Sequence, residues 1–205
     1  MAAVWLAGAC ATSGRGAATP SAPAPHGAIR DPFAPTAGDG GPLPHRLGLL
    51  TEGETLRFDE PGAGIGIEYM GEHGIYATVY VYDMELAAIP DGIESDVARA
   101  ELERSLAELA EMERIGRYHG VKVRKVDKVS IGHGPGSLPA FLAELAYEFD
   151  GVDNASWLLL TALRGNFVKV RFTYPAARAD EGERALLGFV DDLAVRLREI
   201  ARGDR

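Results

Sequence analysis

Alternating apolar and polar residues predict two short strands in the first half of the chain. Residues 64–70 alternate isoleucine or tyrosine with glycine or glutamate, and residues 75–82 alternate aliphatic residues with tyrosine or threonine. The β-branched and aromatic residues in both segments favour strands. The tyrosines on one side of the second strand are Tyr76, Tyr80 and Tyr82.

Two longer segments carry apolar residues at steps of three and four, which is the spacing of an amphipathic helix. They cover residues 94–118 and 180–201, and the second has a wide stripe centred on Phe189 and Leu193. The intervening chain predicts four more strands, joined by turns rich in glycine, aspartate and asparagine. These strands cover residues 120–129, 138–149, 156–164 and 167–174.

The order of elements is therefore ββ-α-ββββ-α. Short turns between the last four strands predict an antiparallel meander. The most economical packing of these elements is one antiparallel sheet of about six strands with two long helices, an α+β fold.

A family resemblance follows from this order and from one segment of sequence. A strand pair, a long helix, a meander ending in Gly165-Asn166-Phe167-Val168-Lys169-Val170-Arg171-Phe172-Thr173-Tyr174-Pro175 and a closing amphipathic helix resemble the PsbP-like fold. This fold is shared by photosystem II extrinsic proteins and by bacterial envelope lipoproteins, and the resemblance covers about residues 55–203. It implies a largely non-enzymatic protein.

Composition and charge exclude several classes of function. The chain has 205 residues, 46% of them hydrophobic, and a formal net charge of −9. An acidic protein lacks the basic surface that general nucleic-acid binding needs, so we expect no nucleic-acid partner. A single cysteine, Cys10, excludes an internal disulfide and a multi-cysteine zinc site.

The first ten residues, Met-Ala-Ala-Val-Trp-Leu-Ala-Gly-Ala-Cys, are apolar and end in small residues. They resemble the end of a bacterial signal sequence with a lipobox, in which the cysteine becomes lipid-modified. Two features depart from that pattern: Ala7 stands where the family usually has leucine, and a basic n-region is missing. A start codon placed too far downstream would explain the missing basic residues. We expect Cys10 to be lipidated; the alternative is an unmodified tail.

The following segment, residues 11–48, predicts a disordered linker. Of its 38 residues, 27 are Gly, Ala, Pro, Ser or Thr. Such a segment cannot bury enough apolar surface to offset the conformational entropy that it would lose on becoming ordered. We therefore expect a signal remnant over 1–10, a linker over 11–48 and a single domain over 49–205. The last segment holds 18 basic and 28 acidic residues, a net charge of −10.

Two groups of residues form a candidate binding surface, and no catalytic residues are predicted. Tyr76, Tyr80 and Tyr82 could line a ligand site, because a phenol offers both apolar area and a hydrogen bond; packing beneath a helix would explain them equally. Charged residues inside predicted strands indicate an edge or a sheet face open to water. They are Glu144, Glu148, Lys169 and Arg171.

No cofactor or metal is expected. The histidines outside the linker, His73, His119 and His133, form no short metal-binding pair, so a zinc site would need the fold to bring them together. A catalytic site would likewise have to be assembled from scattered residues such as His119, Asp127 and Ser130.

These observations favour a lipid-anchored protein of the bacterial cell envelope, with its domain facing the periplasm or the exterior. Its expected role is that of a non-catalytic binding or assembly module. The expected partners are the membrane, through a lipid on Cys10, and an envelope protein or small ligand. The alternative is an envelope hydrolase or transferase.

Overall fold

The computed structural model describes residue 33 and residues 42–134 and 136–203, all within one compact unit, Asp31–Arg205. Cys10, the expected signal remnant and most of the expected linker lie outside the described residues. The elements in chain order are β1 (Arg46–Leu47), β2 (Leu50–Arg57), β3 (Ile65–Met70), β4 (Tyr76–Tyr82), α1 (Asp96–Arg114), β5 (His119–Ile131), β6 (Leu138–Phe149), β7 (Val152–Leu163), β8 (Asn166–Pro175), a short 3₁₀ turn (Ala176–Arg178) and α2 (Ala179–Arg202).

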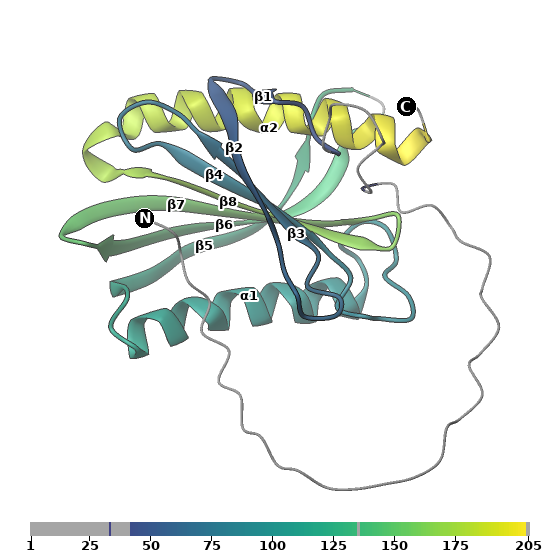
Figure 1. Ribbon diagram of the computed structural model, residues 1–205, viewed down its shortest axis with the longest axis horizontal. Helices are drawn as coiled ribbons and strands as arrows, with labels where there is room; N and C mark the ends of the chain where they lie inside the picture. The colour runs from purple at the N-terminus through teal and green to yellow at the C-terminus, as the bar shows by residue number, and fades with distance from the viewer. Residues whose placement is uncertain (1–32, 34–41, 135, 204–205) are drawn as a thin grey trace, which may run out of the picture. The chain divides into compact units, whose positions relative to one another are not determined.

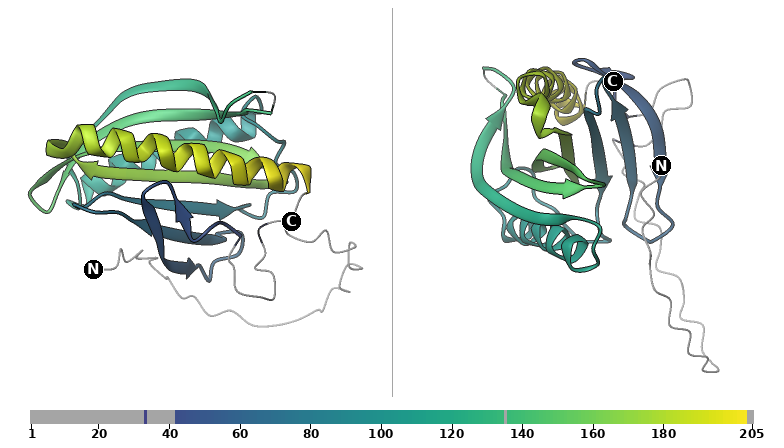
Figure 2. Two further views of the ribbon diagram at one scale, coloured as in Figure 1. Left: turned by 90° about the horizontal axis from the view of Figure 1, so that it is seen from above. Right: turned by 90° about the vertical axis from the view of Figure 1, so that its left-hand side faces the viewer.

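All strands form one antiparallel sheet in the order β1-β2-β3-β4-β8-β7-β6-β5. The two hairpin regions meet where β4 pairs with β8, in the middle of the sheet. The sheet is strongly curled, and α1 and α2 cover opposite faces of it (Figures 1 and 2). The expected α+β class with one antiparallel sheet and two helices is therefore confirmed.

The sheet has eight strands rather than the expected number of about six. The two additional strands, β1 and β2, come before the first strand that the sequence pattern predicts. β2 reads Leu-Thr-Glu-Gly-Glu-Thr-Leu-Arg, and its register with β3 shifts between Glu52 and Thr55. A bulge breaks the two-residue alternation on which strand prediction depends, and this explains why the pattern missed β2.

The buried core also includes residues that precede Leu49. Leu43 and Leu47 are buried, and Leu47 belongs to β1. Phe33 is buried in the same core. Isolated apolar residues among glycines and prolines carry no periodic signal, so the composition of residues 11–48 concealed their contribution.

The core is divided by the sheet into two layers. The layer beneath α2 contains one set of alternating residues from β3, β4 and β8, together with Phe189 and Leu193 of α2. The layer beneath α1 is formed mainly by β6, β7 and Phe167 of β8. α1 begins at Ser95, whose hydroxyl accepts a hydrogen bond from the Ala98 amide at 3.1 Å. The candidate residues on β4 and β8 lie on the α1 side.

Candidate functional site

The candidate site lies on the α1 side of β4 and β8, where the two strands pair. Thr78 is opposite Arg171, and Tyr80 is opposite Lys169. Successive side chains of a strand point to opposite faces, so the tyrosines of β4 and the cations of β8 share one face. We call Tyr76, Thr78, Tyr80, Tyr118 and Arg171 the Tyr–Arg face.

One end of this region is closed by a buried ionic network. The Glu101 carboxylate, on α1, accepts hydrogen bonds from the Tyr82 hydroxyl, from two Arg104 nitrogens at 2.7 Å and from the Ser105 hydroxyl at 3.1 Å. Glu101 is only 2% exposed. Burial, followed by the Glu101 charge, raises the pKa of Tyr82 well above its usual range. Tyr82 is therefore committed to this network and is not part of the Tyr–Arg face.

Lys169 is likewise committed to contacts within the protein. Its ammonium group donates a hydrogen bond to Glu108 at 3.2 Å and lies 5.4 Å and 5.3 Å from the ring centres of Tyr80 and Tyr82. The residue is buried, and this burial lowers its pKa despite the neighbouring Glu108 carboxylate. A cation already paired with a carboxylate and two rings contributes little to an external ligand.

Arg171 differs from its neighbour on the strand. It is half-buried, and its Nε is buried without a hydrogen-bond partner. Within residues 42–134 and 136–203, no ion pair of Arg171 is found. Glu68 stands on the same face two strands away, with its Cα about 10 Å from that of Arg171 at the usual strand spacing, and no ion pair between the two is found among the described residues. Buried charges are normally paired, so this guanidinium is the one group of the Tyr–Arg face with unused binding capacity.

Neutral phenols surround Arg171. Its charge acts on Tyr80 and Tyr118, but burial dominates and raises the pKa of both, that of Tyr118 to about 12. Burial also raises the pKa of Tyr76, on the opposite side. These phenols stay protonated at neutral pH. The hydroxyls of Tyr76 and Tyr118 interact with that of Tyr147, and the hydroxyl of Tyr80 interacts with that of Thr78. A cation among neutral donors is an arrangement that attracts an anion.

Residues of β6, β7 and β8 lie beside Tyr118 and form a buried hydroxyl cluster. The Tyr118 ring stacks on Tyr147 with centres 4.2 Å apart, and the Tyr147 hydroxyl lies 3.3 Å from the Thr173 hydroxyl. Ser156 completes this buried hydroxyl cluster, 2.9 Å from Thr173. Tyr118 and Tyr147 were missed by the sequence analysis because they come from a loop and from β6, and only the tertiary fold brings them beside β4.

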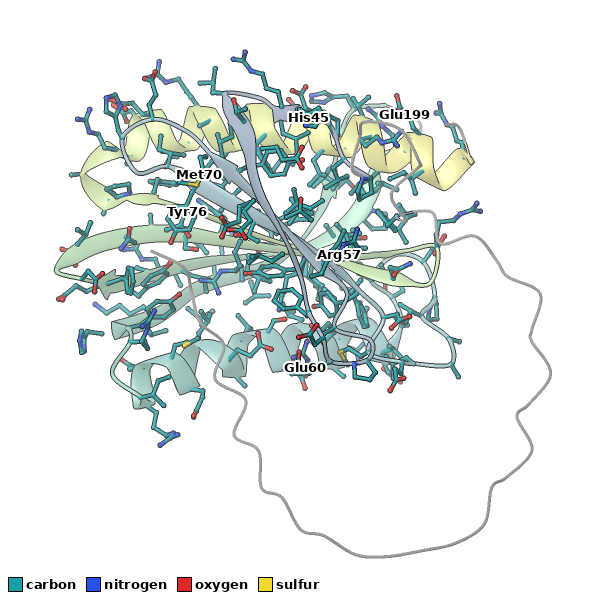
Figure 3. The ribbon with its side chains drawn as sticks, viewed as in Figure 1. His45, Arg57, Glu60, Met70, Tyr76 and Glu199 are labelled. Atoms are coloured by element: carbon teal, nitrogen blue, oxygen red, sulfur yellow. The ribbon has the colours of Figure 1, made fainter. Side chains whose placement is uncertain are left out.

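The Tyr–Arg face has an apolar border on β2 and β3. Phe58 stacks on Tyr80 with centres 6.4 Å apart. Met70, 53% exposed, is opposite Tyr76 in the sheet, and the two lie side by side in Figure 3. Gly66 is opposite Tyr80, and a Cβ there would lie 3.3 Å from the Tyr80 ring and 3.5 Å from that of Phe58. The glycine thus allows both rings to lie close to the sheet.

The structure separates the other two candidate residues from this face. Glu144 is opposite Trp157, which packs in the α2 layer, and its carboxylate accepts a hydrogen bond from Arg124 at 3.1 Å. Glu148 has the same orientation, four residues further along β6. Of the seven surface candidates, Tyr76, Tyr80 and Arg171 lie on the Tyr–Arg face. Tyr82 and Lys169 lie on the same side of the sheet but are committed to residues of α1, and the two glutamates lie on the opposite side of the sheet.

The residues considered for catalysis do not converge. His119 and Ser130 lie near opposite ends of β5, on the order of 35 Å apart along the strand. Asp127 is paired with Lys125 at 2.6 Å. In the part of the chain that the structure describes, no three histidine, cysteine, aspartate or glutamate residues form a group that could hold a metal ion.

A separate cavity of about 240 Å³ lies at the other end of β4, where Tyr82 and Asp83 contribute to its wall. Arg57, Asn166 and the buried Phe33 also line it. Asp83 accepts a hydrogen bond from the Glu85 amide at 2.9 Å.

Among the described residues, no helix is long and apolar enough to cross a membrane.

Comparisons with known proteins leave the ligand open. No protein family model matches the chain, and no curated protein matches it. Among solved structures, the chain is similar to cyanobacterial PsbP (CyanoP) from Synechocystis sp. PCC 6803, with 10% identity and a TM-score of 0.45. The similarity covers 67% of this chain and 77% of that chain. The site described above depends on this chain's own geometry.

Proposed function

We propose that this protein is a lipid-anchored, non-catalytic binding module of the bacterial cell envelope that binds an anionic ligand on its Tyr–Arg face. The observation that carries the binding role is Arg171, a half-buried cation with a buried, unpartnered Nε among neutral phenols. A guanidinium left unpaired costs stability unless something else compensates it. An anion at the two terminal nitrogens would neutralise the buried positive charge, while the Nε itself would stay without a partner.

The anchoring role is supported by the sequence alone. Cys10 follows small residues and precedes a segment rich in proline, alanine and glycine. Such a segment would act as a tether between a lipid and the domain, and two or more acyl chains would make the attachment stable.

Anion binding is tested by thermal unfolding in sodium acetate or sodium phosphate against sodium chloride at equal ionic strength. A ligand that binds only the folded state raises the melting temperature, so we expect at least one anion to do so. Arg171→Met should abolish this rise. Arg57→Met is the matched control, because Arg57 is exposed and lines the separate cavity. If Arg57→Met abolished the effect and Arg171→Met did not, the cavity would be the anion site and the proposal would be wrong.

Anchoring is tested independently of binding. The protein, expressed in a bacterial host from its genomic reading frame, should enter the membrane fraction with acyl chains on its N-terminal peptide. Cys10→Ser should abolish both, as measured by fractionation and mass spectrometry. Equal fractionation of the two proteins, without detectable lipid, would refute the anchor and leave the binding role untouched.

A further inference from the structure

We infer that the ligand of the Tyr–Arg face is a small organic acid with one carboxylate and an aromatic or branched apolar body. This inference rests on the proposed anion-binding function and adds the chemical class of the ligand. The charge of the site, the shape of its donor group and the apolar residues at its border support it.

The charge of the site fits one negative charge better than two. Arg171 is the unpaired cation of the face, because Lys169 and Arg104 are both paired with Glu108. Glu68 and Glu108 act electrostatically on Tyr80 at the same face. Residues 49–205 carry a net charge of −10, from 18 basic and 28 acidic residues. A single carboxylate is neutralised by the one cation, whereas a dianion such as hydrogen phosphate would keep an uncompensated negative charge beside these carboxylates.

The donor group has the shape of a carboxylate partner. A guanidinium offers pairs of parallel N–H groups that match the two oxygens of a carboxylate. The Nε of Arg171 is buried, so an incoming anion would meet the two terminal nitrogens. On β4, Thr78 is directly opposite Arg171 and Tyr80 is diagonal to it. The hydroxyl groups of both residues can donate to the same carboxylate oxygens.

The border of the face supplies the surface for an apolar body. The Phe58 and Tyr80 rings lie at 24° to each other over Gly66. Met70 is half-exposed beside Tyr76. A flat aromatic body gains binding free energy from contact with such rings, beyond that from the apolar area it buries. Acetate has too little apolar surface to make this contact.

The arrangement favours a free small acid over an acidic side chain of a partner protein. The phenols that interact with Arg171 come from both sides, Tyr80 from β4 and Tyr118 from the loop after α1. A free aromatic or branched acid carries its apolar body directly on the carboxylate, so it can contact these rings and Arg171 together. The aspartate or glutamate side chain of a partner protein presents only one or two methylene groups beside its carboxylate.

The test uses the Nε–H signal of Arg171 in the NMR spectrum of the ¹⁵N-labelled full chain, assigned by its absence in Arg171→Lys. Benzoate, acetate, phosphate and the peptide acetyl-Ala-Glu-Ala-amide are titrated separately at pH 7 and constant ionic strength. We expect benzoate to shift this signal and to bind at least tenfold more tightly than each of the other probes. Tyr80→Ala should weaken the binding of both benzoate and acetate, because the Tyr80 hydroxyl donates to the carboxylate, and should weaken benzoate more, because the ring contact is lost as well.

The other outcomes separate the inference from the proposed function. Tighter binding of phosphate, or of the glutamate peptide, than of benzoate would overturn the ligand class while leaving anion binding at Arg171 intact. A signal that no probe shifts would overturn both. Circular dichroism of Arg171→Lys and Tyr80→Ala identifies a folding defect, and the wild-type titration does not depend on either variant.

Discussion

Phe189 is the residue whose removal tests the architecture most directly. It is fully buried in α2, with its ring 5.4 Å from that of Tyr69 and 5.5 Å from that of Phe172, both in edge-on contact. Truncating a buried phenylalanine to alanine costs about 3–5 kcal/mol through lost burial and the cavity left behind. For a domain of this size, each kcal/mol lowers the melting temperature by about 2–4 °C. Phe189→Ala should therefore lower it by roughly 6–20 °C.

The matched control lies on the same helix. Leu187 is 66% exposed, and Leu187→Ala should change the free energy of unfolding by less than about 0.5 kcal/mol. Urea unfolding followed by circular dichroism measures both variants under the same conditions. If Phe189→Ala were as stable as Leu187→Ala, α2 would not be packed against the sheet. The helix stripe would then be free to bind a partner protein, and the described core would be wrong.

Three further predictions concern a close backbone approach, the ionic network and the phenols. Gly64→Ala should destabilise the domain far more than Gly151→Ala, as measured by urea unfolding. Both glycines have positive φ, so alanine is strained at either position. A Cβ at Gly64 would in addition lie 1.9 Å from the Val81 carbonyl oxygen, whereas a Cβ at Gly151 would meet nothing within 4 Å. Glu101→Gln should lower the free energy of unfolding by about 1–3 kcal/mol, because it leaves buried donors poorly matched. Glu103 is exposed on the same helix, so Glu103→Gln should leave that free energy almost unchanged. Equal effects of the two variants would argue against the network. Burial raises the pKa of Tyr118 from 10.0 to about 12, so its contribution to stability should be complete below pH 10 and be lost as the pH rises through 12, with Tyr118→Phe reducing that loss.

The buried glutamate illustrates what a helix pattern conveys and what it leaves out. Glu101 occupies a position three residues after Ala98 and four before Ser105, on the face of α1 that is buried. Residue type alone favours the polar side of an amphipathic helix for a glutamate. Its carboxylate can be buried only because Tyr82, Arg104 and Ser105 all donate to it, and Tyr82 comes from a strand before the helix.

The sequence by itself determined the elements that depend on local periodicity. The alternation in β4, β6, β7 and β8 and the stripe of α2 were sufficient for the α+β class and the antiparallel meander, because the side-chain period of a strand or helix is a property of its own backbone. Where the period was broken, as at the bulge of β2, the pattern failed. Phe33 and Leu47 were missed for the related reason that an isolated apolar residue has no period.

Only the tertiary structure decided which candidate residues act together. The two-residue period places Tyr80 and Tyr82 on one face of a strand, and Lys169 and Arg171 on one face of another, but it does not say which strands are neighbours. The pairing of β4 with β8 brings these four residues to the same side, and α1 then covers part of them, pairing Lys169 with Glu108. Arg171 remains the unpaired cation because pairing and coverage depend on contacts between residues distant in sequence, which no local pattern records.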